Sequence, residues 1–160
     1  MKITVTQLVR GAVIAALYAT LTIVASPISF GPVQFRVSEA MTVLPFIFPE
    51  AIIGLSIGCF LSNIIGSTLI DAIFGTLATL LAAIVTAKCK KLWLAPLPPV
   101  IFNGAIVGLV VTLMTVEFSW MNYLFIALSI AASEIVVCYA CGIPLLIAVN
   151  SLGKKHKFFR

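Results

Sequence analysis

Long apolar runs, separated by short polar or proline-containing segments, fill most of the chain. Such runs are typical of helices that cross a bilayer, for which about 20 apolar residues suffice. The pattern predicts six transmembrane helices, at about residues 8–26, 37–49, 51–66, 70–87, 96–116 and 120–149. The second and third are short, so we expect them to be short or tilted spans. If they were fused across Pro45–Glu50 into one kinked helix, five crossings would remain.

The composition supports a membrane protein. Apolar residues make up 62% of the 160 residues and charged residues only 9%, whereas a soluble domain carries about a quarter charged residues. We therefore expect an all-α integral membrane protein, a single domain over residues 1–160, in the cell membrane. The first run follows Lys2 and Arg10, as in a signal peptide, but Pro27 stands where cleavage would be expected. We interpret this run as a retained helix.

Positive charge is confined almost entirely to the edges of the apolar runs. Apart from Arg36, the cations form three clusters: Lys2 and Arg10; Lys88, Lys90 and Lys91; Lys154, Lys155, Lys157 and Arg160. Six crossings place all three clusters on one side, whereas five crossings separate them. Because cytoplasmic loops are enriched in Lys and Arg, we expect six crossings with both termini in the cytoplasm. The net charge of +5 would suit a nucleic-acid partner, but the sequence has no stripe in which arginines alternate with aromatic residues. We therefore expect no nucleic-acid partner.

Small residues recur at four-residue spacing in three of the runs. They are Gly54, Gly58, Ser62 and Gly66 in the third, Gly104 and Gly108 in the fifth, and Gly11, Ala15 and Ala19, beside Ala12 and Ala16, in the first. Such stripes let helix backbones approach closely in lipid. For the third and fifth helices we expect packing within the chain. For the first helix, packing within the chain and docking onto another membrane subunit both stay open.

Six polar residues interrupt the apolar runs. Arg36, Glu39, Asn63 and Asp71 fall toward the outer side, whereas Asn103 and Glu134 fall deeper. An ionisable residue at the centre of a bilayer costs about 2.5–3.5 kcal/mol on insertion scales, so each needs a reason. The outer four either converge on a ligand or have local roles, with Arg36 and Glu39 forming an ion pair and Asp71 capping a helix. Glu134 has to face a cavity, a ligand or a partner such as Asn103.

Aromatic residues and one bent segment add to the candidate site. Trp120, Tyr123 and Tyr139 offer stacking faces for a flat ligand, although the first two are equally typical of the aromatic belt at a membrane surface. The segment from Ser26 to Arg36 is apolar and contains two prolines. It is either a lid over the outer polar residues or a plain connector.

The chain lacks the motifs of an enzyme or an ATPase. The nearest trace of a nucleotide-phosphate loop is Gly153-Lys154, where Ala148 and Lys155 replace residues that the motif requires. We identify no metal-ligand cluster and no catalytic set of Ser, His and Asp. The pair Cys138 and Cys141 is more typical of packing than of metal binding. We therefore expect no catalysis, cofactor or metal, and a separate motor if the chain takes part in active transport.

The chain resembles the QueT family of substrate-capture subunits (S components) of energy-coupling-factor (ECF) transporters. The resemblance lies in 35–45 (Phe-Arg-Val-Ser-Glu-Ala, then Thr-Val-Leu-Pro), in 54–59 with Asn63, and in 71–83. It continues through Asn103, Gly108 and Glu134 to the Gly-Ile-Pro of 142–144, although Ser133 stands where a glycine is expected. The resemblance implies a six-helix subunit that binds a 7-deazaguanine precursor of queuosine from outside. It also implies a transmembrane coupling subunit and two cytoplasmic ATPases, with docking through Gly11, Ala12, Ala15, Ala16 and Ala19.

The candidate residues suit such a ligand. A carboxylate accepts two adjacent N–H groups of a guanine-like edge, and a second carboxylate suits an aminomethyl cation. The predicted substrate site comprises Arg36, Glu39, Asn63, Asp71, Asn103 and Glu134, with Trp120 and Tyr139. Three alternatives stay open: an S component for another vitamin-like ligand, a stand-alone carrier with Glu134 as its proton site, and a structural subunit of a membrane complex.

Overall fold

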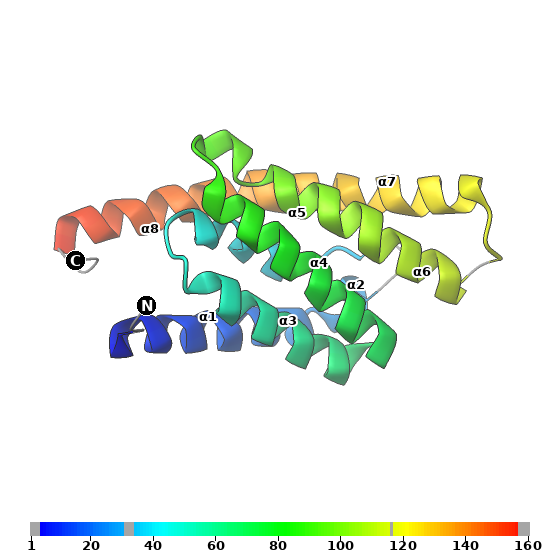
Figure 1. Cartoon of the computed structure of the whole chain (residues 1–160), viewed down its shortest axis with the longest axis horizontal. Helices are drawn as coiled ribbons and strands as arrows, with labels where there is room; N and C mark the ends of the chain where they lie inside the picture. Colours follow the sequence, from blue (N-terminus) through cyan, green and yellow to red (C-terminus); the bar gives the residue numbers. More distant parts are fainter. Residues whose placement is uncertain (1–3, 31–33, 116, 157–160) are drawn as a thin grey trace.

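The computed structural model of the chain describes residues 4–30, 34–115 and 117–156. Every element in this part of the chain is a helix, which confirms the expected all-α fold (Figure 1). In chain order the elements are α1 Val5–Val24, α2 Ser26–Ser29, η1 Val37–Phe46, α3 Ala51–Gly66, α4 Leu69–Lys88, η2 Leu92–Leu94, α5 Leu97–Phe102, η3 Asn103–Val107, α6 Gly108–Thr115, α7 Trp120–Val137, η4 Cys138–Gly142 and α8 Ile143–His156. The elements η1 and η2 are 3-10 helices, whereas η3 and η4 are π-helical turns.

Four stretches are long and apolar enough to cross a membrane. They are Val5–Val24, Leu69–Lys88, Leu92–Thr115 and Trp120–Leu152. The two short runs of the sequence are the shorter apolar helices Val37–Phe46 and Ala51–Gly66. Apolar helices therefore occur at all six predicted places, whereas six complete crossings stay a prediction.

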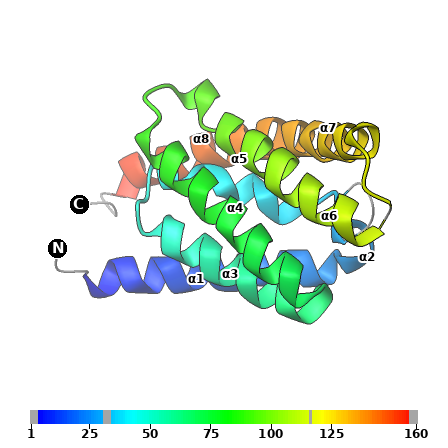
Figure 2. The ribbon, with the colours of Figure 1, turned by 45° about the vertical axis from the view of Figure 1, so that its right-hand side comes forward.

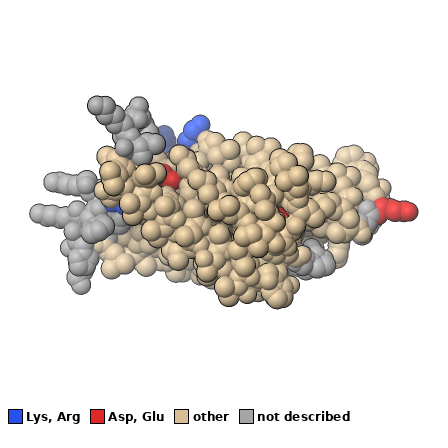
Figure 3. Space-filling model, turned by 90° about the horizontal axis from the view of Figure 1, so that it is seen from below, with Lys and Arg blue, Asp and Glu red and all other residues tan. Residues whose placement is uncertain are grey.

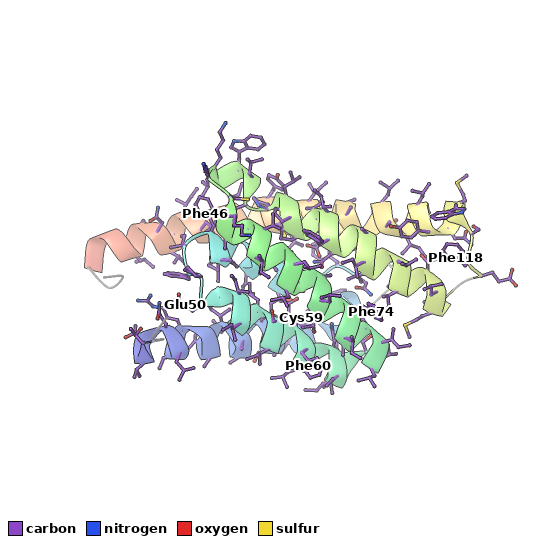
Figure 4. The ribbon with its side chains drawn as sticks, in the orientation of Figure 1. Phe46, Glu50, Cys59, Phe60, Phe74 and Phe118 are labelled. Atoms are coloured by element: carbon purple, nitrogen blue, oxygen red, sulfur yellow. The ribbon has the colours of Figure 1, made fainter. Side chains whose placement is uncertain are left out.

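The two ends of the chain lie at the same end of the bundle, on the left in Figure 1. The connection between α4 and α5, which carries Lys90 and Lys91 directly after Lys88 at the end of α4, lies toward this end too, also in the turned view of Figure 2. Phe118 lies at the other end (Figure 4), and uncharged residues cover most of the length between on the face drawn in Figure 3. This is the arrangement that cytoplasmic termini require. Lys2, Lys157 and Arg160 lie outside the described residues, and the orientation stays a prediction.

Helices α1 and α3 pack backbone against backbone. A Cβ atom added to Gly54 would lie 2.5 Å from the carbonyl oxygen of Gly11, and one added to Gly58 would lie 2.7 Å from that of Ala15. Only glycine permits contacts this close, because any side chain would overlap the neighbouring backbone. The glycines of α3 thus pack within the chain, as expected.

The 3-10 helix η1 lies in the interior, with every side chain from Ser38 to Pro45 buried. Ten residues extend roughly 20 Å at the 3-10 rise of about 2 Å each, against roughly 15 Å in an α-helix. Because three residues make one turn, Glu39 and Thr42 share one ridge and Met41 and Leu44 share another. The polar ridge contacts Cys138 of η4, and the apolar ridge joins a core cluster with residues of α1 and α3.

The π turns η3 and η4 interrupt the two longest helical stretches. Directly after η3, a Cβ atom on Gly108 would lie 2.8 Å from the Cα of Ala127 in α7. Within η4, a Cβ atom on Gly142 would lie 3.1 Å from the side chain of Val43 in η1. The glycines of the fifth apolar run therefore pack within the chain, as expected, and η4 is held closely against η1.

Candidate functional site

Arg36 and Asp71 form a buried ion pair where η1 meets the start of α4. Arg36 Nη2 lies 3.2 Å from Asp71 Oδ2, and both side chains are only 4% exposed. Arg36 Nε donates to the carbonyl oxygen of Ser29 at 3.1 Å, and the guanidinium lies 5.1 Å from the ring centre of Phe30. The sequence suggested Glu39 as a local partner of Arg36, but in the structure its ion-pair partner is Asp71, 35 residues away.

Asn63 and Thr68 complete the surroundings of Asp71. The backbone N–H of Asp71 donates to Thr68 Oγ1 at 3.3 Å, so Thr68 caps α4 and the Asp71 carboxylate is free to bind Arg36. Asn63 Nδ2 donates to the carbonyl oxygen of Asp71 at 3.3 Å. A Cβ atom added to Gly75 would lie 2.9 Å from Asn63 Nδ2 and 3.4 Å from Asp71 Oδ1. The lack of a side chain at Gly75 therefore lets both groups pack closely against α4.

Glu39 and Glu134 lie together deeper in the bundle. Tyr18 of α1 donates a hydrogen bond to Glu39 Oε1. Asn103 Nδ2 donates to Glu134 Oε1 at 2.8 Å, as the sequence suggested, and Cys138 Sγ lies 3.3 Å from Glu134 Oε2. Asn103 also interacts with Glu39, and the two carboxyl groups are close enough to affect each other electrostatically. The two carboxyl groups therefore belong to one buried polar cluster.

Irregular helices position these deeper residues. Asn103 is the first residue of η3, and Glu134 precedes η4 by one turn. A π turn inserts an extra residue into a helix, which changes the direction of the side chains around it, and such turns are frequent at functional sites. The 3-10 form of η1 places Glu39 beside the same two helices. The three irregular elements η1, η3 and η4 thus lie around the Asn103 and Glu134 pair.

The six polar residues of the predicted site are all buried in this region, which we call the polar core: Arg36, Glu39, Asn63, Asp71, Asn103 and Glu134. The structure adds Tyr18, which is fully buried and was not predicted. Its place four residues after Ile14 and four before Thr22, both buried on the same face of α1, was the available signal.

Trp120 and Tyr139 lie apart from the hydrogen bonds of the polar core. Trp120 is 72% exposed at the start of α7. It packs edge-on against Phe118 and Tyr123, with ring centres 5.6 and 6.3 Å away. Tyr139 is half-buried in η4. The part of the chain that the structure describes therefore does not bring Trp120 to the polar core, and a stacking role for either residue stays a prediction.

Several oxygens of the polar core have no hydrogen-bond donor among the described residues. They are Ser29 Oγ, Glu39 Oε2, Asn63 Oδ1 and Asp71 Oδ1. Buried polar atoms are normally paired, since an unpaired one costs about 1–3 kcal/mol. Three of the four can only accept, so the polar core fits a ligand that brings several N–H donors. A metal ion is a poorer fit, because no group of three His, Cys, Asp or Glu side chains with metal-binding geometry occurs in the described ranges.

The sequence matches the family described as QueT transporter over residues 8–151, which is nearly the whole chain. The chain belongs to the QueT transporter family. A relative named "Queuosine precursor transporter QueT", from Lactococcus lactis subsp. cremoris (strain MG1363), is 45% identical over 76 residues. That alignment covers 46% of this chain and 45% of the relative, so it spans about half the length of each. No solved structure matches the chain.

Membership of the QueT transporter family, together with the apolar helices, identifies a multi-pass protein of the cell membrane. The matched region includes every residue of the polar core. It also includes an apolar groove of about 470 Å³ between α1 and α3. All five small residues of the predicted docking stripe line this groove: Gly11, Ala12, Ala15, Ala16 and Ala19. Gly11 and Ala15 also lie against the glycines of α3.

Proposed function

We propose that this chain is the substrate-binding subunit of an ECF transporter that takes up a 7-deazaguanine precursor of queuosine. The observation that carries the proposal is the buried polar core, with unpaired acceptor oxygens, in a chain of the QueT family. Transporters bind solutes through polar groups inside the membrane, where such groups are otherwise too costly to retain. The name of the relative from Lactococcus supplies the ligand class.

The hydrogen-bonding capacity of the polar core suits a deazaguanine. The edge of such a ring presents several N–H donors, and carboxylate and amide oxygens accept them. The side chains of Asp71 and Asn63 both lie against Gly75, and their Oδ1 atoms both lack a donor among the described residues. We assign the ring edge to these two oxygens and the ring carbonyl to donors on Arg36 or Asn103.

Phe30 packs against Arg36, at the end of the polar core that the proposed orientation places outside. A Cβ atom on Gly66 would lie only 2.1 Å from the Phe30 ring, so the ring fits against the end of α3 because Gly66 has no side chain. The same ring packs against Arg36. Entry from outside would then require Phe30 and α2 to move, which favours the lid interpretation of the segment over a plain connector. Residues 31–33 of that segment lie outside the described residues.

Docking of the transmembrane coupling subunit is proposed for the groove between α1 and α3. Its walls combine small residues of α1 with Ile53, Ile57 and Leu61 of α3. A helix of the coupling subunit would pack closely against such a surface, because the small side chains let its backbone approach. Two cytoplasmic ATPases bound to the coupling subunit would supply the energy, since this chain has no nucleotide-binding motif of its own.

The decisive experiment is identification of the ligand on protein purified in mild detergent. Mass spectrometry should detect a co-purified 7-deazaguanine, and added 7-deazaguanines should raise the melting temperature, whereas riboflavin and thiamine should not. A shift with another vitamin and none with any 7-deazaguanine would refute the ligand class.

A stand-alone proton-coupled carrier is the second candidate, favoured by the buried acid pair Glu39 and Glu134. Liposomes that contain only this chain distinguish the two. Uptake driven by a pH gradient would support the carrier, whereas uptake only with the coupling subunit, the ATPases and ATP supports the ECF assignment.

A further inference from the structure

A second apolar groove, of about 650 Å³, runs along the face of α1 that points away from the docking groove. We call it the η1 groove. One wall is a ridge of α1 from Val9 to Leu21, and the opposite wall is formed by residues of η4 and α8. The floor includes Met41 and Leu44 of η1, which belong to the apolar core. Neither the polar core nor the proposed docking groove accounts for this surface.

The η1 groove differs from the docking groove in the side chains along α1. The docking groove is lined by glycine and alanines of α1, whereas the ridge of the η1 groove consists of the branched residues Val9, Val13, Leu17 and Leu21, each at least 41% exposed. Helices in lipid pack through small residues that let their backbones approach, and branched side chains keep a second helix at a distance. A flexible acyl chain needs no such approach. The surface therefore suits a lipid better than a helix.

The length of the η1 groove matches one leaflet of a bilayer. From Val9 to Leu21, α1 advances by roughly 18 Å at a rise of about 1.5 Å per residue. The hydrocarbon core of a bilayer is about 30 Å thick, so one leaflet contributes about 15 Å. An acyl chain that begins beside Val9 would therefore follow the ridge to its far end.

Positive charge gathers at the end of the η1 groove where both ends of the chain lie. Arg10 lines the groove there. Its Nη1 atom lies 3.2 Å from Glu50 Oε1, and its guanidinium lies 5.2 Å from the ring centre of Phe48. These contacts hold a guanidinium, whose several N–H donors suit phosphate, at the mouth of the groove. In the sequence Lys154 and Lys155 follow at the end of α8. The charge at this end complements an anionic headgroup.

We propose that the η1 groove binds an acyl chain of an anionic phospholipid, with the lipid phosphate beside Arg10 and the end of α8. The acyl chain covers η1 where Ala40, Met41 and Leu44 are between 5 and 7% exposed at the floor of the groove. It fills the space between α1 and α8 and so stabilises their positions on η1. Because the site is separate from the polar core and from the docking groove, the inference does not rest on the proposed function.

Native mass spectrometry of the full chain in mild detergent tests the choice of lipid. Delipidated protein is titrated with phosphatidylglycerol or with phosphatidylcholine that carries the same acyl chains. Phosphatidylglycerol should bind about tenfold more tightly, a difference of about 1.4 kcal/mol, because only its headgroup has a net negative charge. Equal affinity for the two lipids would overturn the anionic headgroup, and no binding of either would overturn the site.

The double variant Arg10→Gln with Glu50→Gln tests the position of the headgroup. It removes the guanidinium without leaving the Glu50 carboxylate unpaired. The preference for phosphatidylglycerol should fall to about threefold or less, while binding of phosphatidylcholine stays the same. A preference that stays at about tenfold would refute the placement of the phosphate beside Arg10.

Leu17→Trp tests the position of the acyl chain, since a larger side chain at this exposed place fills the groove. It should weaken binding of phosphatidylglycerol about tenfold and keep the melting temperature of the delipidated protein. Val13→Trp serves in its place if Leu17→Trp does not fold. The matched control is Leu128→Trp, the same change at an exposed position of α7 that lines neither groove, which should bind the lipid normally.

Two results would assign the η1 groove to another occupant or remove it. Unchanged lipid binding by the tryptophan variants would refute the location. A lipid-free dimer that Leu17→Trp dissociates would assign the groove to a second copy of this chain, and loss of the coupling subunit from that variant would assign it to the coupling subunit.

Discussion

The two interfaces of α1 are formed by opposite kinds of contact. Toward α3, the helix packs through backbone atoms, because glycines on α3 let the chains approach to distances at which a Cβ atom would overlap a carbonyl oxygen. Toward η1, the same helix presents Tyr18 and Thr22, which hydrogen-bond to Glu39 and Ser38. The first interface depends on the absence of side chains and the second on their polar atoms. A single helix therefore connects the polar core with the groove where a coupling subunit would dock.

The largest effect is expected at the ion pair of the polar core. Arg36→Met should destabilise the protein by about 3–5 kcal/mol, because it leaves the buried Asp71 carboxylate unpaired. The melting temperature in detergent measures the effect. The double variant Arg36→Met with Asp71→Asn should recover part of the loss, and a double variant no more stable than the single one would show that the charge pair is not the cause.

A smaller loss is expected at the interface of α1 with α3. Gly54→Val should destabilise the protein by about 1–3 kcal/mol, since the new side chain would meet the backbone of Gly11. The control, Thr20→Val, introduces the same side chain on the exposed face of α1 and should keep the melting temperature. An unchanged melting temperature for Gly54→Val would contradict the backbone packing of the two helices.

Ligand binding should depend on the polar core and not on the interface between α1 and α3. Glu39→Gln and Glu134→Gln should each weaken binding of the 7-deazaguanine ligand at least tenfold, or about 1.4 kcal/mol, because each replaces a carboxylate of the polar core with a neutral amide. Titration calorimetry gives the affinity. Unchanged affinity in both variants would remove these residues from the site.

The smallest effect on the subunit itself is expected in the groove. Ala12→Leu and Ala16→Leu should keep both the melting temperature and ligand affinity, since both residues are exposed, yet prevent co-purification of the coupling subunit. Ala15 is less suitable than its neighbours, because it is buried against α3 and a larger side chain would also disturb the fold. Recovery of the full complex at normal yield from both variants would exclude this surface.

The sequence predicted the positions of the apolar helices, and the six polar residues that it singled out are all buried, for a physical reason. Their role as a substrate site stays a prediction. Exposing an apolar run to water or a charge to lipid costs considerable free energy. Both kinds of residue are therefore recognisable from their positions in the sequence. Small-residue spacing likewise predicted the packing of Gly54 and Gly58.

The partners of the polar residues were harder to predict. The pairing of Arg36 with Asp71 depends on how η1 lies against α4, which spacing along the chain does not determine. The 3-10 form of η1 and the π turns beside Asn103 and Glu134 depend on packing between helices, so α-helical periodicity does not reveal them. Tyr18 was missed because an aromatic residue in an apolar run is usually a packing residue.

The division of the polar core along the chain has a consequence for how the protein is made. Tyr18, Arg36, Glu39 and Asp71 are synthesised first, whereas Glu134 lies in the last long helix. Until that helix leaves the ribosome and enters the bilayer, Asn103 lacks the Glu134 carboxylate that accepts its hydrogen bond. A nascent chain truncated before α7 should thus be held by the insertion machinery or degraded. Insertion of the final helix would complete the proposed binding site and would allow the finished chain to leave the insertion machinery.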